Sequence, residues 1–376
     1  MSAAFDVPEA SIDPTQLGPM LVAWQRRSGR QDLPWQRDRS AYRVWVSEIM
    51  LQQTQVATVI GYFERFMARF PNVSELAAAP IDDVLHLWTG LGYYARARNL
   101  HRAARQICDR FGGEFPRHFA EVAELPGIGR STAGAILALA YDERQPILDG
   151  NVKRVLARVF EIEGNAAQRA VEQQLWALAD ACTPAQDVAT YTQAVMDLGA
   201  TVCSRRNPAC ALCPVRAQCR ARASARQHEI PAPKPRAARK ARPARACWWL
   251  LPIDAEGRVL LERRPERGVW GGLWCPLQFD TATAAASYAR QRFAVEANQL
   301  ESLGTIDHVF THFDLAITPL LLRGVAAADA VMEPSGVLWY NPRDGAVRVG
   351  LPAPAKQLLD DLLGQPLVNS RDSLHD

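Results

Sequence analysis

The chain has 376 residues, 48% of them hydrophobic, and this length exceeds one compact core of ordinary size, so two or three domains are expected. The formal net charge is only +3, which excludes a uniformly basic nucleic-acid-binding protein and leaves room only for local basic surfaces. No segment approaches the roughly 18 apolar residues of a membrane span, and the N-terminus has no basic region followed by an apolar one, so we expect a soluble cytoplasmic protein without a signal peptide.

Helical spacing of apolar residues dominates the first part of the chain. Helices are expected at Gln16–Arg27, in one or two pieces within Tyr42–Met67, and at Ile81–Trp88, Arg96–Phe111, Phe119–Leu125, Ser131–Ala140, Val152–Phe160, Ala167–Ala181 and Thr190–Leu198. The segment Leu33–Trp35 is expected to form an extended bend. Because no strand pattern interrupts the helices, residues 1–225 are predicted to form one mainly α-helical domain.

Residues 226–246 are predicted to be a linker. Between residues 220 and 246 the chain carries nine Lys or Arg and four prolines against a single acid, Glu229. Such a composition cannot bury enough apolar surface to fold by itself. It suits a solvated spacer or a strap along a phosphate backbone, and the two roles are compatible.

From Cys247 the pattern changes to strands. They are expected at Trp248–Ile253, Arg258–Arg263, Leu273–Phe279, Leu315–Leu322 and Val337–Tyr340, with helices near Ala282–Phe293 and Ala355–Leu363. Residues 247–376 are therefore predicted to form an α+β domain.

A glycine-rich turn opens one of the predicted helices. Gly127 and Gly129 follow Pro126 and precede the small-residue helix that starts at Ser131. Glycines let the backbone approach a partner closely, and the start of a helix presents free N–H groups and a positive dipole end. The turn is suited to a phosphate, although a capped turn without a ligand has the same pattern.

Two acids have the residue environments that glycosidic-bond cleavage requires. Glu48 has Val44, Trp45 and Leu51 as helical neighbours, so it lies on an apolar face and its pKa is expected to rise toward about 6. Asp149 precedes a helix in Asp149-Gly150-Asn151. One acid would protonate the leaving base and the other would stabilise the positive charge on the sugar. The alternative for Glu48 is a glutamate paired with an arginine at the edge of a helix-packing interface. The alternative for Asp149 is an ordinary helix N-cap.

Four segments together resemble the MutY adenine DNA glycosylase family of the helix-hairpin-helix base-excision superfamily. They are Trp45–Val56, Gly90–Leu100, the glycine-rich turn and Leu148–Asn151, and the likeness covers nearly the whole chain. The resemblance implies that Glu48 protonates adenine at N7 and later positions water. It also implies that Asp149 stabilises the oxocarbenium ion or captures it transiently.

The resemblance implies a duplex DNA partner carrying adenine opposite 8-oxoguanine, with guanine as a second possible opposite base. A monomer associated with the nucleoid is expected. In this family, residues that correspond to Gln52, Gln53 and Tyr93 enter the duplex, and the tyrosine lies beside the damaged guanine. The alternative for Tyr93 is a tyrosine packed in the core. The predicted DNA-binding residues are Gln52, Gln53, Tyr93, Arg96, Gly127, Gly129, Asn151, Lys153 and Arg154. Leu33, Trp35 and Gln193 are candidates for the adenine pocket.

Ser131 distinguishes this chain from lyases of the same superfamily. Endonuclease III-type relatives carry a lysine there, whose amine attacks the sugar. A hydroxyl cannot form that imine, so a monofunctional glycosylase is predicted. Some members of the family carry a tyrosine at this position, and Lys153 is a weaker alternative nucleophile on the next helix.

Four cysteines, Cys203, Cys210, Cys213 and Cys219, include only one Cys-x-x-Cys pair. Four thiolates suit zinc or an iron–sulfur cluster, and the spacing resembles that of the [4Fe-4S] loop of this superfamily. A cluster bound by residues 203–219 is therefore implied, with nearby arginines shaping a phosphate-binding surface. The other cysteines, Cys108, Cys182, Cys247 and Cys275, are expected to be packed thiols.

The C-terminal domain resembles the Nudix fold in its order of elements. Its helix near Thr281–Glu296 contains no acid before the last residue, so metal-dependent diphosphate hydrolysis is not expected. Phe310, Thr311 and His312 resemble the Phe-Ser-His loop with which the family recognises 8-oxoguanine, with threonine in place of serine. An edge strand with exposed histidines and a His-x3-His metal pair are the alternatives.

Three functions follow from these patterns. The first is a monofunctional glycosylase that removes adenine opposite 8-oxoguanine by hydrolysing the N-glycosidic bond. The second is a lyase-active glycosylase for damaged pyrimidines, which Ser131 disfavours. The third is a mismatch sensor that binds without cutting, which the pairing of Glu48 with Asp149 disfavours.

Overall fold

The computed structural model describes residues 13–233, 242–326, 336–344 and 347–363. The chain divides into two compact units. The first comprises residues 1–78 and 99–237, and the second comprises residues 79–98 and 238–376. The long helix that contains residues 98 and 99 therefore passes from one unit to the other.

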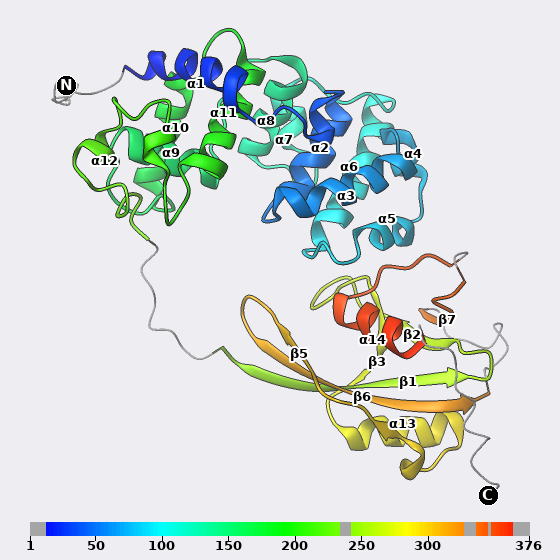
Figure 1. The fold of residues 1–376 in the computed structure, drawn as a ribbon. Coiled ribbons are helices and arrows are strands. Elements are labelled where there is room, and N and C mark those ends of the chain that lie inside the picture. The colour runs from blue at the N-terminus through cyan, green and yellow to red at the C-terminus, as the bar shows by residue number, and fades with distance from the viewer. Residues whose placement is uncertain (1–12, 234–241, 327–335, 345–346, 364–376) are drawn as a thin grey trace, which may run out of the picture. The chain divides into compact units, whose positions relative to one another are not determined.

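The first unit is built from helices in its described residues (Figure 1). They are α1 (Pro14–Ser28), η1 (Pro34–Gln36), α2 (Ala41–Leu51), α3 (Val56–Arg69), α4 (Val73–Ala78), α6 (Ala95–Phe111), α7 (Phe119–Ala123), α8 (Arg130–Tyr141), α9 (Gly150–Val159), α10 (Arg169–Cys182), α11 (Val188–Asp197), η2 (Leu198–Val202), η3 (Cys210–Leu212) and α12 (Arg220–Ala223). The predicted helical character is confirmed. The sequence did not predict the short α4, which buries only Val73 and Leu76, or the 3-10 turn of η1.

One hydrophobic core fixes the helices that carry the candidate site. Leu17 and Leu21 of α1 pack with Val155 of α9 and with residues of α8, α10 and α11. Ile147 and Leu148, which lead directly into α9, are also part of this core. Burial of these side chains anchors the start of α9, because each buried aliphatic side chain stabilises the fold by about 1.5–3 kcal/mol.

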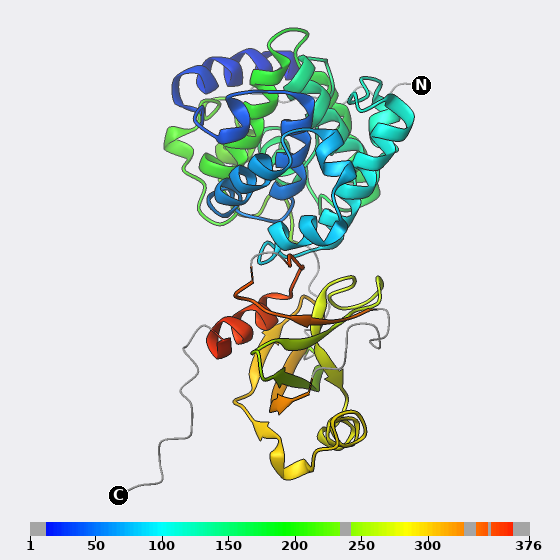
Figure 2. The same cartoon turned by 90° about the vertical axis from the view of Figure 1, so that its right-hand side faces the viewer.

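The second unit contains α5 (Ile81–Trp88) and a mixed sheet. Its strands are β1 (Ala244–Asp254), β2 (Val259–Arg263), β3 (Trp274–Phe279), β4 (Glu301–Ser302), β5 (Ile306–Val309), β6 (Asp314–Val325) and β7 (Val337–Tyr340), and its other helices are α13 (Ala282–Phe293), η4 (Ala297–Gln299) and α14 (Ala353–Leu363). The strand order is β4-β6-β1-β3-β2-β7, with β5 paired to β6. Helices α13 and α14 lie on opposite faces of this sheet (Figure 2).

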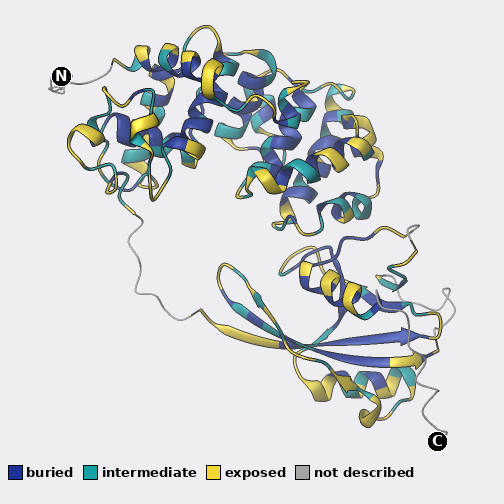
Figure 3. Cartoon of the chain, in the orientation of Figure 1, coloured by how far each residue is buried: buried dark blue, intermediate teal, exposed yellow. Residues whose placement is uncertain are grey.

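The central strands have few polar residues because both of their faces are covered. β1 and β6 run parallel, with Trp249 opposite Pro319 and Leu251 opposite Leu321, and their inner parts are buried (Figure 3). Such continuous apolar runs are typical of strands covered on both sides. The α+β prediction is confirmed here, although the sequence did not predict β4 and offered an edge strand near β5 only as an alternative.

Helix α5 packs within the second unit. Trp274 donates from Nε1 to Asp82 Oδ1 at 3.2 Å, and His86 Nδ1 lies 3.2 Å from the carbonyl oxygen of Val349. Tyr94, just after α5, donates from its hydroxyl to the carbonyl of Leu351 at 3.0 Å. The loop that carries Tyr93 therefore belongs to the same unit as the sheet.

The predicted linker, residues 226–246, contains three kinds of segment. Residues 226–233 pack on the helical unit, where Ile230 is buried and Arg226 forms ion pairs with Glu161 and Glu163. Residues 234–241 lie outside the described residues, and β1 already begins at Ala244. Among the described residues, no helix combines the length and the apolar character that a membrane crossing would need.

Candidate active site

Glu48 lies on α2 and is half-buried. Loss of hydration raises the pKa of its carboxyl group to about 7, and the negative charge of Asp149 is the second cause. The predicted direction of the shift is confirmed. At neutral pH a substantial fraction of Glu48 is therefore protonated and able to donate a proton.

Asp149 caps the N-terminus of α9. Its Oδ1 accepts a hydrogen bond of 2.7 Å from the backbone N–H of Val152, and its Oδ2 lies 3.4 Å from Nδ2 of Asn151. Burial raises the pKa of Asp149, while the N–H groups of Val152 and Asn151 oppose that rise. Asp149 is therefore an N-cap, as the alternative interpretation predicted. This position is compatible with a reactive carboxylate, because the helix N-terminus favours the ionised form of Asp149.

The glycine-rich turn lies between α7 and α8, and its two glycines are exposed. Gly127 has a φ of +83°, and a Cβ added there would lie 2.9 Å from the Asn99 side chain. Gly129 is the N-cap of α8, and a Cβ there would meet no atom within 4 Å. The exposed glycines at the start of a helix are compatible with phosphate binding, which remains a prediction.

Helix α8 holds the segment that ends at Asp149. The Ser131 hydroxyl accepts a hydrogen bond of 2.9 Å from the backbone N–H of Leu148. A Cβ added to Gly134 would lie 2.7 Å from the carbonyl oxygen of Pro146, so the two backbones approach closely. Because α2 also packs against α8, α8 sets the position of Asp149 relative to the helix of Glu48.

The three polar residues that follow Asp149 have partners inside the protein. The Lys153 ammonium forms an ion pair with Glu172 of α10. Arg154 donates from Nε to the carbonyl of Cys203 at 2.8 Å and from Nη2 to Oδ1 of Asn151 at 2.8 Å. A chain of polar contacts therefore runs from Asp149 through Asn151 and Arg154 to the cysteine loop. Contacts of these three residues with DNA remain predictions.

The candidate adenine-pocket residues are all buried. Leu33, Trp35 and Gln193 have exposed fractions of 8%, 6% and 7%. Trp35 packs edge-on against Phe63 with ring centroids 5.4 Å apart. Gln193, on α11, donates from Nε2 to Asp197 Oδ1 at 2.8 Å and also lines a polar pocket.

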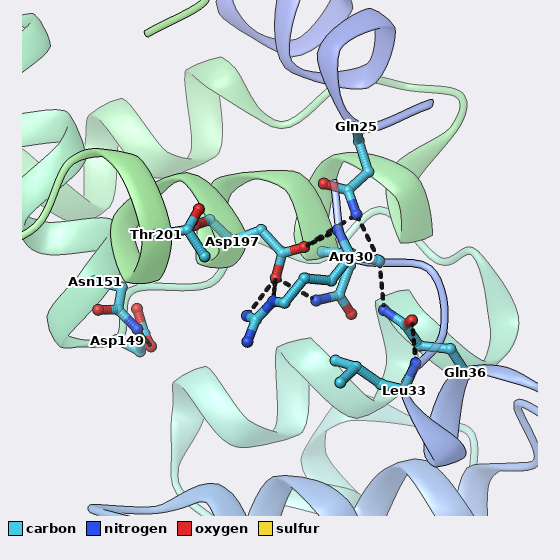
Figure 4. Close-up of polar contacts among 9 residues, drawn as sticks. Gln25, Arg30, Leu33, Gln36, Asp149, Asn151, Asp197 and Thr201 are labelled. Carbon is cyan, nitrogen blue, oxygen red and sulfur yellow. Dashed lines mark hydrogen bonds and ion pairs between the residues drawn. The ribbon is translucent and has the colours of Figure 1, made fainter. Parts of the chain in front are cut away.

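Asp197 is the centre of a buried network that the sequence did not predict (Figure 4). Its carboxylate is 1% exposed, and it accepts from Gln25 Nε2 at 3.1 Å and from Arg30 Nε at 2.9 Å. Gln36 in turn donates to the carbonyl of Arg30 and accepts from the Leu33 N–H. Asp197 lies four residues after Gln193 on a largely apolar helix. An acid in that position is the sequence feature that could have indicated a buried polar network.

Two turns carry the predicted duplex-inserting residues. Gln52 is the C-cap of α2, and the exposed Gln53 that follows has a φ of +58°. Tyr93 is 51% exposed and has a φ of +49°, next to Gly92 at +74°. Buried Arg96 donates to the carbonyls of Leu91 and Gly92 and lies under the Tyr93 ring. Arg96 also lies over the Trp88 ring of α5, and its contact with DNA remains a prediction.

The four cysteines of the predicted cluster loop line one cavity together with Arg158. All four are half-buried. Burial raises the pKa of Cys213 to about 12, opposed by the N–H of Val215 and reinforced by the three other thiols. Cys182, Cys247 and Cys275 are buried elsewhere, as packed thiols are, whereas Cys108 is half-buried.

The candidate lesion-recognition residues lie at the tip of the β5–β6 hairpin. The N–H of Phe310 bonds to the carbonyl of Phe313 at 2.9 Å, which leaves the exposed Thr311 and His312 as the two tip residues. The Phe310 ring stacks on Phe313 with ring centroids 4.6 Å apart, and it lies tilted against Trp270 with centroids 5.4 Å apart. In the described part of the chain β5 pairs with β6 alone, so the edge-strand alternative is confirmed for His308, whereas Thr311 and His312 lie in the turn.

Comparison with known proteins decides the family. Residues 46–181 match the family model described as "HhH-GPD superfamily base excision DNA repair protein", and residues 248–361 match the NUDIX domain. The chain is 36% identical over 342 residues to the adenine DNA glycosylase of Buchnera aphidicola subsp. Acyrthosiphon pisum (strain APS), covering 91% of this chain and 96% of that protein. It is 35% identical over 387 residues to the adenine DNA glycosylase of Homo sapiens, covering 86% of this chain and 70% of that protein.

The chain belongs to the adenine DNA glycosylase family. The resemblance seen in the sequence is thereby confirmed. The helical fold is also similar to that of a solved thermostable thymine-DNA glycosylase, with 24% identity, a TM-score of 0.51, and coverage of 56% of this chain and 97% of that one. The predicted fold class, a helical glycosylase unit followed by a Nudix-like domain, is confirmed.

The Nudix-like domain of this family member has no acidic residue on α13, whose sequence is ATAAASYARQRF. The helix therefore supplies no carboxylates for a magnesium site of the pyrophosphohydrolase type. Recognition, rather than hydrolysis, remains the predicted role of this domain.

The raised pKa of Glu48 predicts a pH-dependent loss of stability. Because the folded-state pKa of about 7 lies above the ordinary value of 4.5, the contribution of Glu48 is fully present at low pH and lost as pH rises toward 7. Glu48→Gln cannot ionise, so its free energy of unfolding relative to wild type should rise between pH 5 and 8 by on the order of 3 kcal/mol at most. Urea unfolding of the DNA-free protein measures this difference.

The exposed Glu64 of α3 provides the control. Glu64→Gln should show the same pH dependence as wild type. A constant difference between Glu48→Gln and wild type across this pH range would contradict a raised pKa at Glu48.

Proposed function

We propose that this chain is a monofunctional adenine DNA glycosylase that removes adenine mispaired with 8-oxoguanine, and also with guanine, from duplex DNA. The observation that supports the proposal best is the convergence of Glu48, whose pKa is about 7, with Asp149 at the start of α9. Membership of the adenine DNA glycosylase family supports the choice of base.

The two acids divide the work of breaking the N-glycosidic bond. Protonated Glu48 donates its proton to N7 of adenine, which makes the base a better leaving group. The carboxylate of Asp149, stabilised by the N-terminus of α9, balances the positive charge that develops on the sugar. After adenine leaves, the Glu48 carboxylate orients the water that attacks the sugar carbon.

Gln193 has a defined orientation in the proposed adenine pocket. Since Asp197 is a hydrogen-bond acceptor, it fixes the Gln193 amide with Nε2 toward the carboxylate. The Gln193 carbonyl oxygen is then available to accept from the exocyclic amine of adenine. Leu33 and Trp35 would cover the faces of the base.

The exposed residues of three turns suit a duplex DNA partner. The N–H groups at Gly127 and Gly129 would hold a phosphate at the start of α8. Tyr93, with half of its surface exposed, would stack beside the base opposite adenine. Gln53 would fill the space left by the extruded nucleotide, and the monomer is the proposed binding state.

The residues of the cysteine loop fit a [4Fe-4S] cluster better than a single metal ion. Thiolates around one tetrahedral zinc lie only about 3.8 Å apart. Among the described residues no three His, Cys, Asp or Glu are close enough to hold one ion, yet Cys203, Cys210, Cys213 and Cys219 line the same cavity. A bound cluster would bring binding energy that organises this loop, and base release does not involve it.

Two contacts support monofunctional chemistry. Ser131 uses its hydroxyl to accept from Leu148 and has no amine to form an imine. The Lys153 ammonium, the alternative nucleophile, is held by Glu172. The product should therefore be an intact strand with an abasic site.

Recognition of 8-oxoguanine is assigned to the β5–β6 tip. Thr311 and His312 are exposed there, and the Thr311 hydroxyl lies 3.2 Å from Nδ1 of His312. These groups can bond to the edge of a base, while Phe310 offers a ring for stacking.

The proposed chemistry predicts the behaviour of Glu48→Gln. Wild-type protein should release free adenine from a duplex with one 8-oxoguanine·adenine pair and leave a site cleaved only by alkali. Glu48→Gln should lower the single-turnover rate by at least ~100-fold, because it loses the general acid, whereas Glu64→Gln should match wild type. Unchanged release by Glu48→Gln would contradict the assignment, and strand cleavage without alkali would indicate a lyase.

The hairpin assignment predicts a selective effect of Phe310→Ala. This variant should lower the ratio of rates on 8-oxoguanine·adenine and guanine·adenine duplexes by about tenfold, since base–aromatic stacking contributes ~1–3 kcal/mol. Val309→Ala removes a neighbouring side chain that is 61% exposed and should leave the ratio unchanged. Equal ratios for Phe310→Ala and wild type would contradict the assignment.

A further inference from the structure

Arg158 lies near the end of α9 and is only 3% exposed. Its guanidinium group is engaged on every side. Nε donates to the carbonyl of Ile230 at 2.9 Å, Nη1 to the carbonyl of Ser204 at 2.7 Å, and Nη2 to the carbonyl of Arg205 at 3.1 Å. Arg158 therefore connects α9 to two segments distant in sequence.

The same guanidinium contacts a sulfur atom. Nη1 of Arg158 lies 3.3 Å from Sγ of Cys203. On the other side, the Cys219 thiol lies 3.5 Å from the backbone carbonyl oxygen of Arg158. One residue of α9 thus touches both the first and the last cysteine of the loop.

The charge of Arg158 has no carboxylate partner in the described part of the chain. All of its side-chain contacts there are carbonyl oxygens and the Cys203 sulfur. A buried cation without a compensating anion is costly, at several kcal/mol even after relaxation. The charge distribution around Arg158 therefore calls for an anion in the adjoining cavity.

The cavity beside Arg158 is the one lined by the four cysteines. An iron–sulfur cluster held by four thiolates has a net negative charge, because the thiolates outweigh the charge of the core. Its sulfur atoms accept N–H hydrogen bonds, and such bonds and nearby charges set the reduction potential.

We propose that Arg158 is the internal counter-ion of the cluster and a positioning residue for Cys203. The inference rests on the proposed cluster. The positive charge and the N–H···S bond stabilise the more reduced cluster and so raise its reduction potential. The bonds to Ser204, Arg205 and Ile230 hold the loop closed around the cluster and slow its loss.

Arg222 provides a matched control. It lines the same cavity, but it is exposed and donates to the carbonyl of Arg216 at 3.2 Å rather than to a sulfur. Its charge should be screened by solvent and should affect the cluster little.

The experiment compares the full-length wild type with Arg158→Met, Arg158→Lys and Arg222→Met. Iron content and visible absorbance first establish whether the wild type holds a cluster; their absence would defeat the cluster proposal itself. Electrode measurements then give the reduction potential, and the decay of absorbance with an iron chelator gives the rate of cluster loss.

Arg158→Met should have a more negative potential and lose its cluster on the order of tenfold faster. Arg158→Lys should recover part of the potential, because it retains the charge, and Arg222→Met should match wild type. If Arg158→Met holds no cluster, Arg158→Lys becomes the deciding variant. A cluster retained by Arg158→Lys supports the counter-ion role of Arg158. An Arg158→Lys protein that has wild-type helicity but no cluster contradicts that role. A loaded Arg158→Met with wild-type potential and loss rate would overturn the inference.

Discussion

Poor hydration of two neighbouring carboxyl groups, reinforced by the repulsion between them, is the constraint on which the account of this protein depends. Burial and the charge of Asp149 together keep the pKa of Glu48 near 7. Burial raises the pKa of Asp149 as well, but N–H groups at a helix N-terminus oppose that rise and favour its anion. The two acids therefore lie in different environments, as an acid and a charge-stabilising carboxylate require.

The fold maintains this pair through α8. Glu48 lies on α2, which packs against α8, and the segment before Asp149 is held by Ser131 and by the close backbone approach at Gly134. Neither contact involves a reacting atom. A small side chain and a glycine on α8 are thus as important to the geometry as the acids, because a shift of about 1 Å can cost ~100-fold in rate.

The sequence predicted what local spacing controls. Helix spacing located the helices of the first unit, and the apolar neighbours of Glu48 predicted its raised pKa. Interactions between distant residues were not predictable in this way. Gln25 and Asp197 are 172 positions apart in the sequence, and Arg158 and Ile230, which also share a hydrogen bond, are 72 positions apart. Arg96 was predicted as a DNA contact with the family resemblance, but its burial and its bonds to two carbonyls of the preceding loop were not predictable from local spacing. The roles of the site residues came from family resemblance rather than from periodicity.

A double-mutant cycle tests the central claim most directly. Single-turnover rates of adenine release would be measured for wild type, Glu48→Gln, Asp149→Asn and the double variant on one duplex. If both acids act on the same transition state, the double variant should be little slower than the slower single variant. A loss equal to the product of the two single losses would show that the acids act independently and would contradict the account.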